Sequence, residues 1–406
     1  MRSMRGAITA LALGAIVVGA CGGPPQPGAP AASAPGAGAG AAGPKFPDTP
    51  VTLNILDIAG QDQLVKGIFE SYKKTYPNRL RDYKIEKATS PEMPAKIKAQ
   101  QDAGNIQTSI VLTGLDGMAA GVEQTIWEPL TPKYAAQLEN MKNYLDEVKP
   151  IQELAKGFGV QVVYTPSGPL LEYNAARVPN PPKTAAELLA WAKANPNKFV
   201  YARPANSGPG RTLLQGLPYI LGDKDPRDPE KGWDKTWQFL KDLDPYIEYY
   251  PTGTTATMKE LSDGTRWMIA STMGWDINPR VLGQVPKEMK VARLDNTSFV
   301  ADEQFMAVPK GLDEGRLAVV LDIINFALRP ESQAITFDAG YFYPGPAVKG
   351  VTLDKAPPES QQAIKEFGRP EYDQWAKESK IVLPLGSKEL VTAFELWDKA
   401  FGAKKK

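Results

Sequence analysis

The chain has 406 residues, with 47 lysines and arginines against 46 aspartates and glutamates, so its formal net charge is +1. This balance offers no broad basic surface for nucleic acid or an anionic membrane. The sequence contains no histidine, which excludes Ser-His-Asp and Cys-His catalysis and removes the commonest transition-metal ligand. Carboxylate-based or lysine-based chemistry remains compatible with the composition, and no cofactor or metal site is indicated.

The first 21 residues have the pattern of a secreted lipoprotein. Arg2 and Arg5 form a short basic region, and residues 7–18 are an apolar run of signal-peptide length, too short for a permanent membrane span. Small residues in Val-Gly-Ala then lead to Cys21, which resembles a bacterial lipobox. Cys21 is the only cysteine and cannot form an internal disulfide. We expect it to be acylated, and an ordinary signal peptide with an incidental cysteine is the alternative.

Residues 22–49 are almost wholly Gly, Pro, Ala and Ser, which predicts a disordered linker between a lipid anchor and the folded part. The amino-terminal pattern therefore predicts an extracytoplasmic protein, in the periplasm or at the cell surface, held to the membrane by lipid alone. About 350 residues remain, too many for one typical core, so two lobes are expected.

The folded part begins with alternating strands and helices. Apolar residues at helical spacing lie between three predicted strands, at residues 51–58, 83–86 and 108–113. A further β-rich run at residues 159–164 is interrupted at residues 165–169 and resumes at residues 170–174, and we interpret it as a strand that crosses between lobes. This alternation predicts a mostly parallel sheet covered by helices.

The second half repeats the alternation. Thr184 and Glu187 fit a capping box that begins a helix, and strands are predicted at residues 199–202 and 267–272. Residues 305–308 are predicted to cross back to the first lobe. The last helix carries an apolar stripe of core residues, and the three final lysines are expected to form a solvated tail. Two lobes joined by crossing strands leave a cleft, and ligands of open α/β sheets bind beyond the carboxyl ends of strands.

The strand-end rule selects Gln61 and Asp62 after the first strand and Thr113 and Asp116 after the third as candidate ligand-binding residues. Helix capping is the alternative role for these four, because Thr and Asp favour cap positions for backbone reasons. Tyr173, in the first crossing strand, is a candidate for the floor of the cleft, or else a strand-packing residue.

The segment from Ser207 to Thr212 lies between a strand and a helix. Amides at a helix amino terminus, together with Arg211, suit an anionic group on the ligand. A plain loop with a surface arginine is the alternative.

Aromatic residues supply the remaining candidates. Trp275, at the end of a later strand, suits a flat or cationic ligand, and the neighbouring Asp276 suits an amine. The turn Gly-Tyr-Phe-Tyr-Pro-Gly-Pro places three aromatic residues, Tyr341, Phe342 and Tyr343, where they close one wall of the cleft, and Tyr341 and Tyr343 are the ligand candidates among them. Core packing is the alternative for all three.

Two stretches resemble bacterial family 1 extracellular solute-binding proteins. One is residues 170–217, LLEYNAARVPNPPKTAAELLAWAKANPNKFVYARPANSGPGRTLLQGL, and the other lies in residues 299–334, FVADEQFMAVPKG followed by VVLDIINFALRPESQA. The resemblance extends over about residues 51–401. Within the family it is greatest to an uncharacterised group allied to polyamine-, thiamine- and iron-binding proteins.

This resemblance implies a periplasmic-binding-protein type II fold, with two α/β lobes joined by crossing strands around a ligand cleft that closes by hinge motion. Family analogy assigns residues 50–165 and 304–349 to lobe 1, and residues 170–300 and 350–406 to lobe 2. It also implies that the chain is not an enzyme and delivers a small solute to the permease and ATPase subunits of an ABC importer. We expect a monomer.

In polyamine-binding relatives, acidic residues near Asp276 and in the return strand contact the ligand, and Asp302 and Glu303 match the second place. Together with Asp62 and Asp116 they predict an acidic cleft and a cationic solute. Arg211 argues the other way, and a zwitterion, or a phosphorylated or chelated ligand, satisfies both. Two alternatives stay open, a hydrolase or lyase that uses carboxylate pairs such as Asp276 with Glu303, and a ligand-sensing receptor subunit.

Overall fold

The computed structural model describes residues 43–90 and 92–405. The predicted signal peptide, the expected acylation site Cys21 and the linker up to residue 42 lie outside these residues, so the corresponding predictions are untested. Within residues 43–90 and 92–405, no helix combines the length and the apolar character needed to cross a membrane.

A six-stranded sheet forms the first α/β unit of the described residues. Its strands are β1 (Val51–Asp57), β2 (Leu80–Lys87), β3 (Thr108–Thr113), β4 (Gly159–Gly168), β9 (Phe299–Ala307) and β10 (Ile381–Val382). β1 is parallel to both of its neighbours, β2 and β3, as the alternation of strands and helices predicted. β9 runs antiparallel to β3 and β4, and β10 pairs with its first residues.

Helices cover this sheet because their apolar residues recur at helical spacing. In α1 (Asp62–Thr75), for example, Leu64, Ile68 and Tyr72 are buried on one face and join the core of the sheet. The other helices of this unit are α2 (Met93–Asp102), α3 (Leu115–Glu123), α4 (Val148–Leu154), α10 (Glu314–Ala327) and α11 (Pro330–Gln333), and the 3₁₀ segment η4 (Ala334–Gly340) follows.

A four-stranded sheet forms the second α/β unit in the part of the chain that the structure describes. Its strands, in spatial order, are β6 (Phe199–Val200), β7 (Met268–Ser271), β5 (Leu170–Tyr173) and β8 (Lys290–Ala292). Phe199 and Met268 pack with Leu217, Trp233 and Trp397 in a second core. The surrounding helices are α5 (Ala185–Ala194), α6 (Gly208–Leu221), α7 (Asp234–Leu243), α8 (Thr254–Ser262), α9 (Ile277–Val281) and α14 (Ser387–Ala400).

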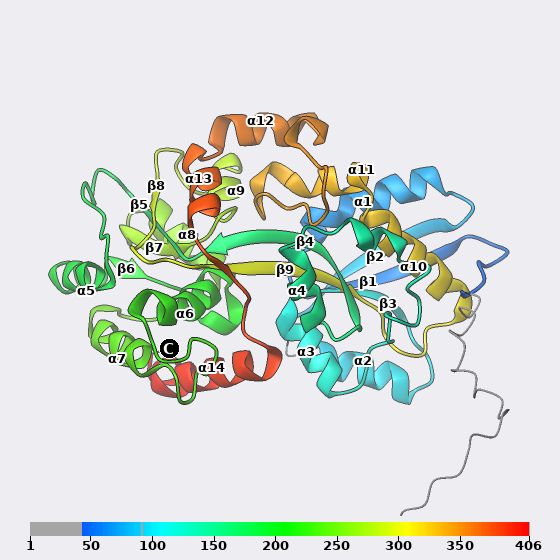
Figure 1. Cartoon of the computed structure of the whole chain (residues 1–406), viewed down its shortest axis with the longest axis horizontal. Coiled ribbons are helices and arrows are strands. Elements are labelled where there is room, and N and C mark those ends of the chain that lie inside the picture. The colour runs from blue at the N-terminus through cyan, green and yellow to red at the C-terminus, as the bar shows by residue number, and fades with distance from the viewer. Residues whose placement is uncertain (1–42, 91, 406) are drawn as a thin grey trace, which may run out of the picture. The chain divides into compact units, whose positions relative to one another are not determined.

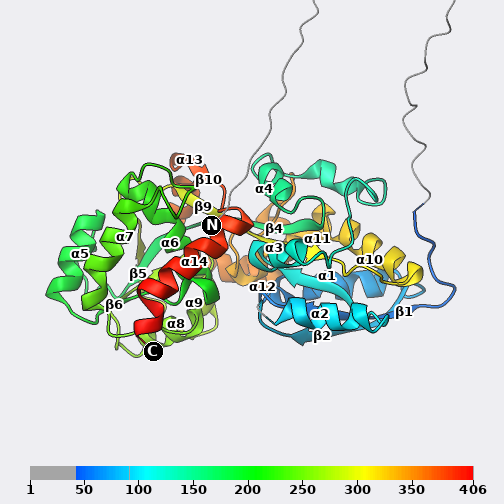
Figure 2. The same ribbon diagram turned by 90° about the horizontal axis from the view of Figure 1, so that it is seen from below.

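Two α/β units with separate cores confirm the predicted two-lobed α/β architecture, and the residue boundaries of the lobes stay a prediction. β4 and β9 lie side by side and run from the larger sheet toward the smaller one (Figure 1). β5 follows β4 directly, so the same stretch of chain serves both sheets. α14 packs in the second core and also contacts α3 of the first unit (Figure 2).

Two further helices, α12 (Pro358–Phe367) and α13 (Pro370–Glu378), join the units. α12 contacts η4 of the first unit and α9 of the second. Short 3₁₀ segments complete the described structure at η1 (Glu139–Asn143), η2 (Pro204–Asn206), η3 (Asp244–Tyr246), η5 (Leu353–Lys355) and η6 (Gly402–Lys404).

The predicted interruption at residues 165–169 is confirmed at Pro169, where β4 gives way to β5, and is wrong for residues 165–168. β4 continues through Gly168, with Thr165 paired to Asp302 and Gly168 paired to Val300. The register shifts between Thr165 and Gly168, so the strand absorbs the residues between them as a bulge and keeps its pairing with β9.

The start of α5 and the carboxyl-terminal tail also differ in detail from the prediction. Thr184 caps α5 as predicted, because its side chain accepts a hydrogen bond from the Glu187 amide at 3.1 Å. The Glu187 carboxylate accepts from the Lys183 amide, whereas in a capping box it accepts from the Thr184 amide. The solvated tail is wrong for Lys405. The Arg203 guanidinium donates to its carbonyl at 3.1 Å, and Lys405 Nζ lies 3.1 Å from Asp244 Oδ1, so the carboxyl terminus is attached to the second unit.

Candidate functional site

A pocket of about 470 Å³ lies where loops of both α/β units meet. Loops that follow β1, β2 and β3 provide one side of its lining, and loops that follow β6 and β7 provide the other. The residues of the lining are Ile58, Ala59, Ala88, Thr89, Ser90, Gly114, Asp116, Ala205, Asn206, Ser207, Gly208, Arg211, Thr252, Thr254, Trp275, Gln304, Tyr341 and Phe342. The pocket therefore occupies the carboxyl ends of strands in both sheets, as the strand-end rule requires.

Arg211 is the basic residue of this lining, and it lies among carboxyl groups. Its Nη2 donates to Asp302 Oδ1 at 2.9 Å, and both side chains are largely buried. Burial disfavours the charged guanidinium, but the carboxyls of Asp302, Asp116 and Glu303 outweigh this effect and raise the pKa of Arg211. The arginine thus stays charged and offsets part of the negative charge around it.

Three helices begin at the pocket. α3 begins at Leu115, α6 at Gly208 and α8 at Thr254, so the positive ends of three helix dipoles face the same region. The start of α6 is fixed by Ser207, whose Oγ accepts from the Gly210 amide at 3.2 Å and lies 2.8 Å from Thr254 Oγ1. This arrangement can hold an anionic group.

Carboxyl groups lie at the start of α3 and beside Arg211. Ser90 Oγ donates to Asp116 Oδ2 at 2.8 Å, which fixes that carboxylate in the lining. Glu303 is buried behind it, and its Oε1 accepts from the Leu115 amide at 3.1 Å. Burial and the neighbouring Asp302 raise the pKa of Glu303 well above its ordinary value, against the opposing effect of Arg211. This part of the pocket can hold a cationic group.

Two aromatic rings form part of the pocket wall. The Trp275 and Tyr341 rings lie edge to face, with centroids 5.2 Å apart. Trp275 packs against the cores of both units. At Gly208, a β-carbon would lie 3.6 Å from Trp275 Nε1 and 3.7 Å from Asp302 Oδ2, so the missing side chain leaves this space to a ligand.

The family described as bacterial extracellular solute-binding protein matches residues 67–366. The chain belongs to this family. The match confirms the family predicted from residues 170–217 and 299–334. Solute-binding proteins of this kind are components of ABC transporters, where they bind small molecules outside the cytoplasm and work with permease and ATPase subunits. No curated protein is similar enough in sequence to count as a match.

Solved structures of other solute-binding proteins share the fold. The spermidine/putrescine ABC transporter substrate-binding protein PotD from Streptococcus pneumoniae is 16% identical, with a TM-score of 0.58 over 86% of this chain and 98% of that one. Apo ferric ion-binding protein A from Pasteurella haemolytica is 13% identical, with a TM-score of 0.61 over 86% and 97%. AfuA from Actinobacillus pleuropneumoniae, solved with fructose-6-phosphate, is 16% identical, with a TM-score of 0.60 over 86% and 98%. These likenesses confirm the predicted periplasmic-binding-protein type II fold.

The solute-binding protein brings five of the predicted ligand residues together in the pocket lining, namely Asp116, Ser207, Arg211, Trp275 and Tyr341. Their ligand contacts stay predictions.

The structure does not bring the other predicted residues into the lining. Gln61, directly before α1, and Thr113, at the end of β3, are fully buried. Asp62 lies 3.2 Å from Lys87 Nζ, and Tyr343 donates to Asp373 Oδ1 at 3.3 Å beside a separate groove. Tyr173 packs against the second core, Glu303 lies behind Asp116, and Asp276 is enclosed by arginines.

Other lining residues were missed. Thr89 and Ser90 follow β2, so applying the strand-end rule to the second strand as well would have selected them. Thr252 and Thr254 lie in a Pro-Thr-Gly-Thr turn at the start of α8, where helix capping was the available signal. Gln304 directly follows Glu303 in β9 and gave no signal of its own. Across the described residues, no group of three or more Asp, Glu, His or Cys is placed to hold a metal ion.

Proposed function

We propose that this solute-binding protein captures a small zwitterionic or cationic solute in the pocket between its two α/β units and delivers it to an ABC importer. The observation that carries the solute class is the placement of one arginine, Arg211, among the three carboxyl groups of Asp116, Asp302 and Glu303. Even without Glu303, whose pKa is raised well above its ordinary value, Asp116 and Asp302 outnumber the arginine, so the pocket favours at least one positive charge on the solute.

The two sides of the pocket suit two different groups of the solute. An ammonium group fits beside Asp116, with the Trp275 ring as a cation–π partner. Gln304 supports this side, because its buried Oε1 has no hydrogen-bond partner among the described residues and can accept from a donor. A carboxylate or phosphate fits the starts of α6 and α8, next to Ser207 and Arg211.

Capture requires the two units to approach each other around the solute. β4 and β9 are the paired strands that lead from one unit to the other, so hinge bending in these strands is the motion that we propose. Closure removes water from the pocket and strengthens the charge pairs described above.

The finer parts of the proposal come from the sequence. Cys21 in its lipobox-like context supports acylation and a lipid anchor, and we propose a monomer that releases its solute unchanged. Incubation of the identified solute with the protein, followed by mass spectrometry, tests the last point, because a hydrolase or lyase would convert the solute into product.

A thermal-shift screen tests the solute class. Polyamines, amino acids, thiamine and its phosphates, sugars and ferric chelates are added to the purified protein, and a binder at a hundredfold excess over Kd stabilises it by about 2.7 kcal/mol. We expect the hits to be amines or zwitterions. Folded protein that shifts with sugars alone, or with none of these compounds, contradicts the proposal.

A pair of variants locates the binding group. Asp116→Asn removes a carboxylate of the lining, and we expect it to weaken binding of the best hit by about tenfold or more. Asp62→Asn is the matched control, because Asp62 lies outside the lining and is paired with Lys87. Equal effects of the two substitutions would place the cation elsewhere.

A further inference from the structure

Asp276 directly follows the pocket residue Trp275 in the chain, yet its carboxylate does not line the pocket. The side chain is fully buried, and the three side chains that bond to its carboxylate, Arg280, Arg369 and Tyr372, lie outside the pocket lining. A buried carboxylate without cations or donors costs several kcal/mol, so its partners have to be part of its role.

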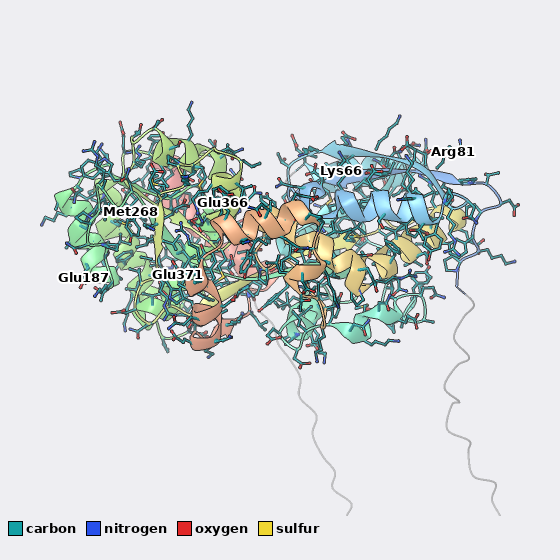
Figure 3. The ribbon with its side chains drawn as sticks, turned by 90° about the horizontal axis from the view of Figure 1, so that it is seen from above. Lys66, Arg81, Glu187, Met268, Glu366 and Glu371 are labelled. Carbon is teal, nitrogen blue, oxygen red and sulfur yellow. The ribbon has the colours of Figure 1, made fainter. Side chains whose placement is uncertain are left out.

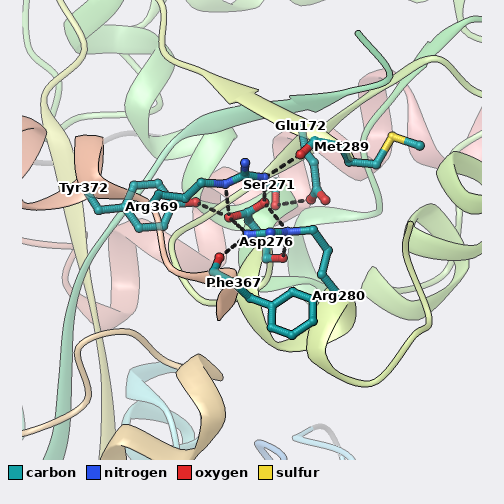
Figure 4. Close-up of polar contacts among 8 residues, drawn as sticks. All are labelled: Glu172, Ser271, Asp276, Arg280, Met289, Phe367, Arg369 and Tyr372. Carbon is teal, nitrogen blue, oxygen red and sulfur yellow. Dashed lines mark hydrogen bonds and ion pairs between the residues drawn. The ribbon is translucent and has the colours of Figure 1, made fainter. Parts of the chain in front are cut away.

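Two arginines and a tyrosine enclose the carboxylate of Asp276 (Figure 4). Arg280 contacts it from α9, through Nη2 at 2.9 Å from Oδ2 and Nε at 3.2 Å from Oδ1. Arg369 forms the second pair, through Nη2 at 2.7 Å from Oδ1 and Nε at 2.9 Å from Oδ2. Tyr372 Oη donates to Oδ2 at 2.8 Å. Two bidentate pairs on one carboxylate fix its position and orientation closely.

Arg369 and Tyr372 belong to a segment that we call the strap, residues 358–378, which consists of α12, a short turn and α13. Glu366 and Glu371 flank this turn, and α12 lies over the junction of the two units (Figure 3). Further bonds fasten the turn to the second unit. Arg280 Nη2 donates to the Phe367 carbonyl and Arg369 Nη2 to the Met289 carbonyl, both at 2.6 Å.

The strap also holds the loop that carries the other pocket aromatic, Tyr341. The Ala339 amide donates to Ser360 Oγ of α12 at 3.1 Å. Ile364 of α12 packs with Phe337 of η4. The strap therefore contacts the chain next to both aromatic rings of the pocket wall. It bonds Asp276, which neighbours Trp275, and it bonds η4, which precedes Tyr341.

The backbones of the two loops touch between these attachments. Gly274 has φ of +89°, and a β-carbon there would lie 2.2 Å from the Tyr341 carbonyl oxygen. Gly340 has φ of +79°, and a β-carbon there would lie 2.4 Å from the Ile277 side chain. With such close contact, a small displacement of either loop changes the position of the other.

We propose that Asp276 is a positioning residue that holds Trp275 against Tyr341 by tying the Trp275 loop to the strap, and so fixes the shape of the pocket wall without contacting the solute. The inference rests on the proposed function only in taking this pocket as the solute site. The proposal also assigns a role to the strap, which supports the Trp275 and Tyr341 loops without lining the pocket.

Fluorine NMR of the full chain labelled with 5-fluorotryptophan tests this proposal without any solute. The chain has 8 tryptophans, and Trp275→Phe assigns the Trp275 signal. Asp276→Asn keeps the size of the side chain but removes the charge shared by the two guanidiniums. We expect the Trp275 signal to shift or split in this variant, together with that of Trp375 on α13, whose ring lies 5.9 Å from Tyr372. The signals of Trp127 and Trp233 stay in place.

Asp322→Asn is the matched control. Asp322 of α10 accepts from Tyr72 Oη at 2.5 Å and from Arg79 Nη1 at 2.6 Å, so it has the same types of partner in a position outside the pocket. We expect Asp322→Asn to leave the Trp275 signal unchanged. Tyr372→Phe is measured alongside, because it removes one bond to Asp276 and keeps both ion pairs.

An unchanged Trp275 signal in both Asp276→Asn and Tyr372→Phe overturns the proposal. An equal shift of Trp275 in Asp322→Asn also overturns it, since Asp276 would then act only through general stability. If Asp276→Asn does not fold, the result with Tyr372→Phe decides. None of these readouts depends on which solute binds, so they fail or succeed separately from the thermal-shift screen.

Discussion

At the scale of single residues, buried charge sets how the protein responds to pH. Asp338 lies in the η4 segment with φ of +28°, next to the loop that carries Tyr341. Burial raises its pKa to about 7, and the nearby Asp62 acts in the same direction, while Gln63 opposes it. The carboxyl of Asp338 is therefore protonated in the folded protein under mildly acidic conditions in which the unfolded chain carries the charge.

The sign of the effect on stability follows from this raised pKa. A group that binds its proton more tightly when folded stabilises the protein below its unfolded pKa, and that contribution is lost as the pH rises to about 7. Asp338→Asn cannot ionise, and asparagine tolerates positive φ better than most residues. We expect the variant to be more stable than wild type at pH 8 by about 4 kcal/mol and similar at pH 4.

Urea unfolding at pH 4, 6 and 8 measures the difference for Asp338→Asn. Asp354→Asn, at an exposed aspartate of η5, removes the same charge as a control and should keep the wild-type pH profile. If Asp338→Asn also keeps that profile, Asp338 is ionised in the folded protein and its environment differs from the one described.

At the scale of elements, most of the pocket lining comes from loops between strands and helices. The sequence predicted these loops where a strand end or a helix start could be recognised from neighbouring residues. Asp116 and Trp275 were selected because each follows a predicted strand closely, and Ser207 and Arg211 because they lie near the amino terminus of a predicted helix. Asp276 was selected for the same reason as Trp275, but its partner Arg369 lies 93 residues further along the chain. Sequence patterns indicate the end of a strand, and they do not indicate which distant side chain encloses the residue found there.

The contact between the Trp275 and Tyr341 loops gives a prediction at this scale. Gly274→Ala introduces a β-carbon 2.2 Å from the Tyr341 carbonyl oxygen in addition to the strain of positive φ. Gly264→Ala is the control, because Gly264 has φ of +79° and nothing within 4 Å of its β-position. We expect about 1–2 kcal/mol of destabilisation for the control from backbone strain alone, and roughly 2 kcal/mol more for Gly274→Ala.

Chemical denaturation compares Gly274→Ala and Gly264→Ala directly. Binding of the best hit from the thermal-shift screen should weaken in Gly274→Ala and stay unchanged in Gly264→Ala, since only the first substitution moves the pocket wall. Equal free energies of unfolding for the two variants would mean that the Trp275 and Tyr341 loops move apart without loss of stability and do not form a fixed contact.

At the scale of the whole molecule, the fold was predicted correctly from alternation of strands and helices and from the stretches at residues 170–217 and 299–334. The errors arose where long-range pairing overrides local signals. Pro166 in residues 165–169 suggested an interruption, but pairing with β9 carries β4 through it. The final lysines suggested a solvated tail, but Arg203 and Asp244 bind Lys405 from positions more than a hundred residues earlier.

At the same scale, we propose that one residue, Cys21, attaches the whole molecule to the membrane. Cys21 is the only cysteine, so Cys21→Ala removes the thiol that acylation requires without disturbing a disulfide. Two or three acyl chains, at about 0.8 kcal/mol per buried methylene, hold a folded domain at a bilayer, whereas none of the described helices can span one. Expressed in a lipoprotein-processing bacterium, the wild-type protein should partition into the detergent phase of Triton X-114 and incorporate labelled palmitate, and Cys21→Ala should partition into the aqueous phase unlabelled. Both proteins should unfold at the same temperature, because the substitution lies outside the residues that form the two α/β units. Partition of Cys21→Ala into the detergent phase would show that something other than an acyl chain on Cys21 holds the protein at the membrane.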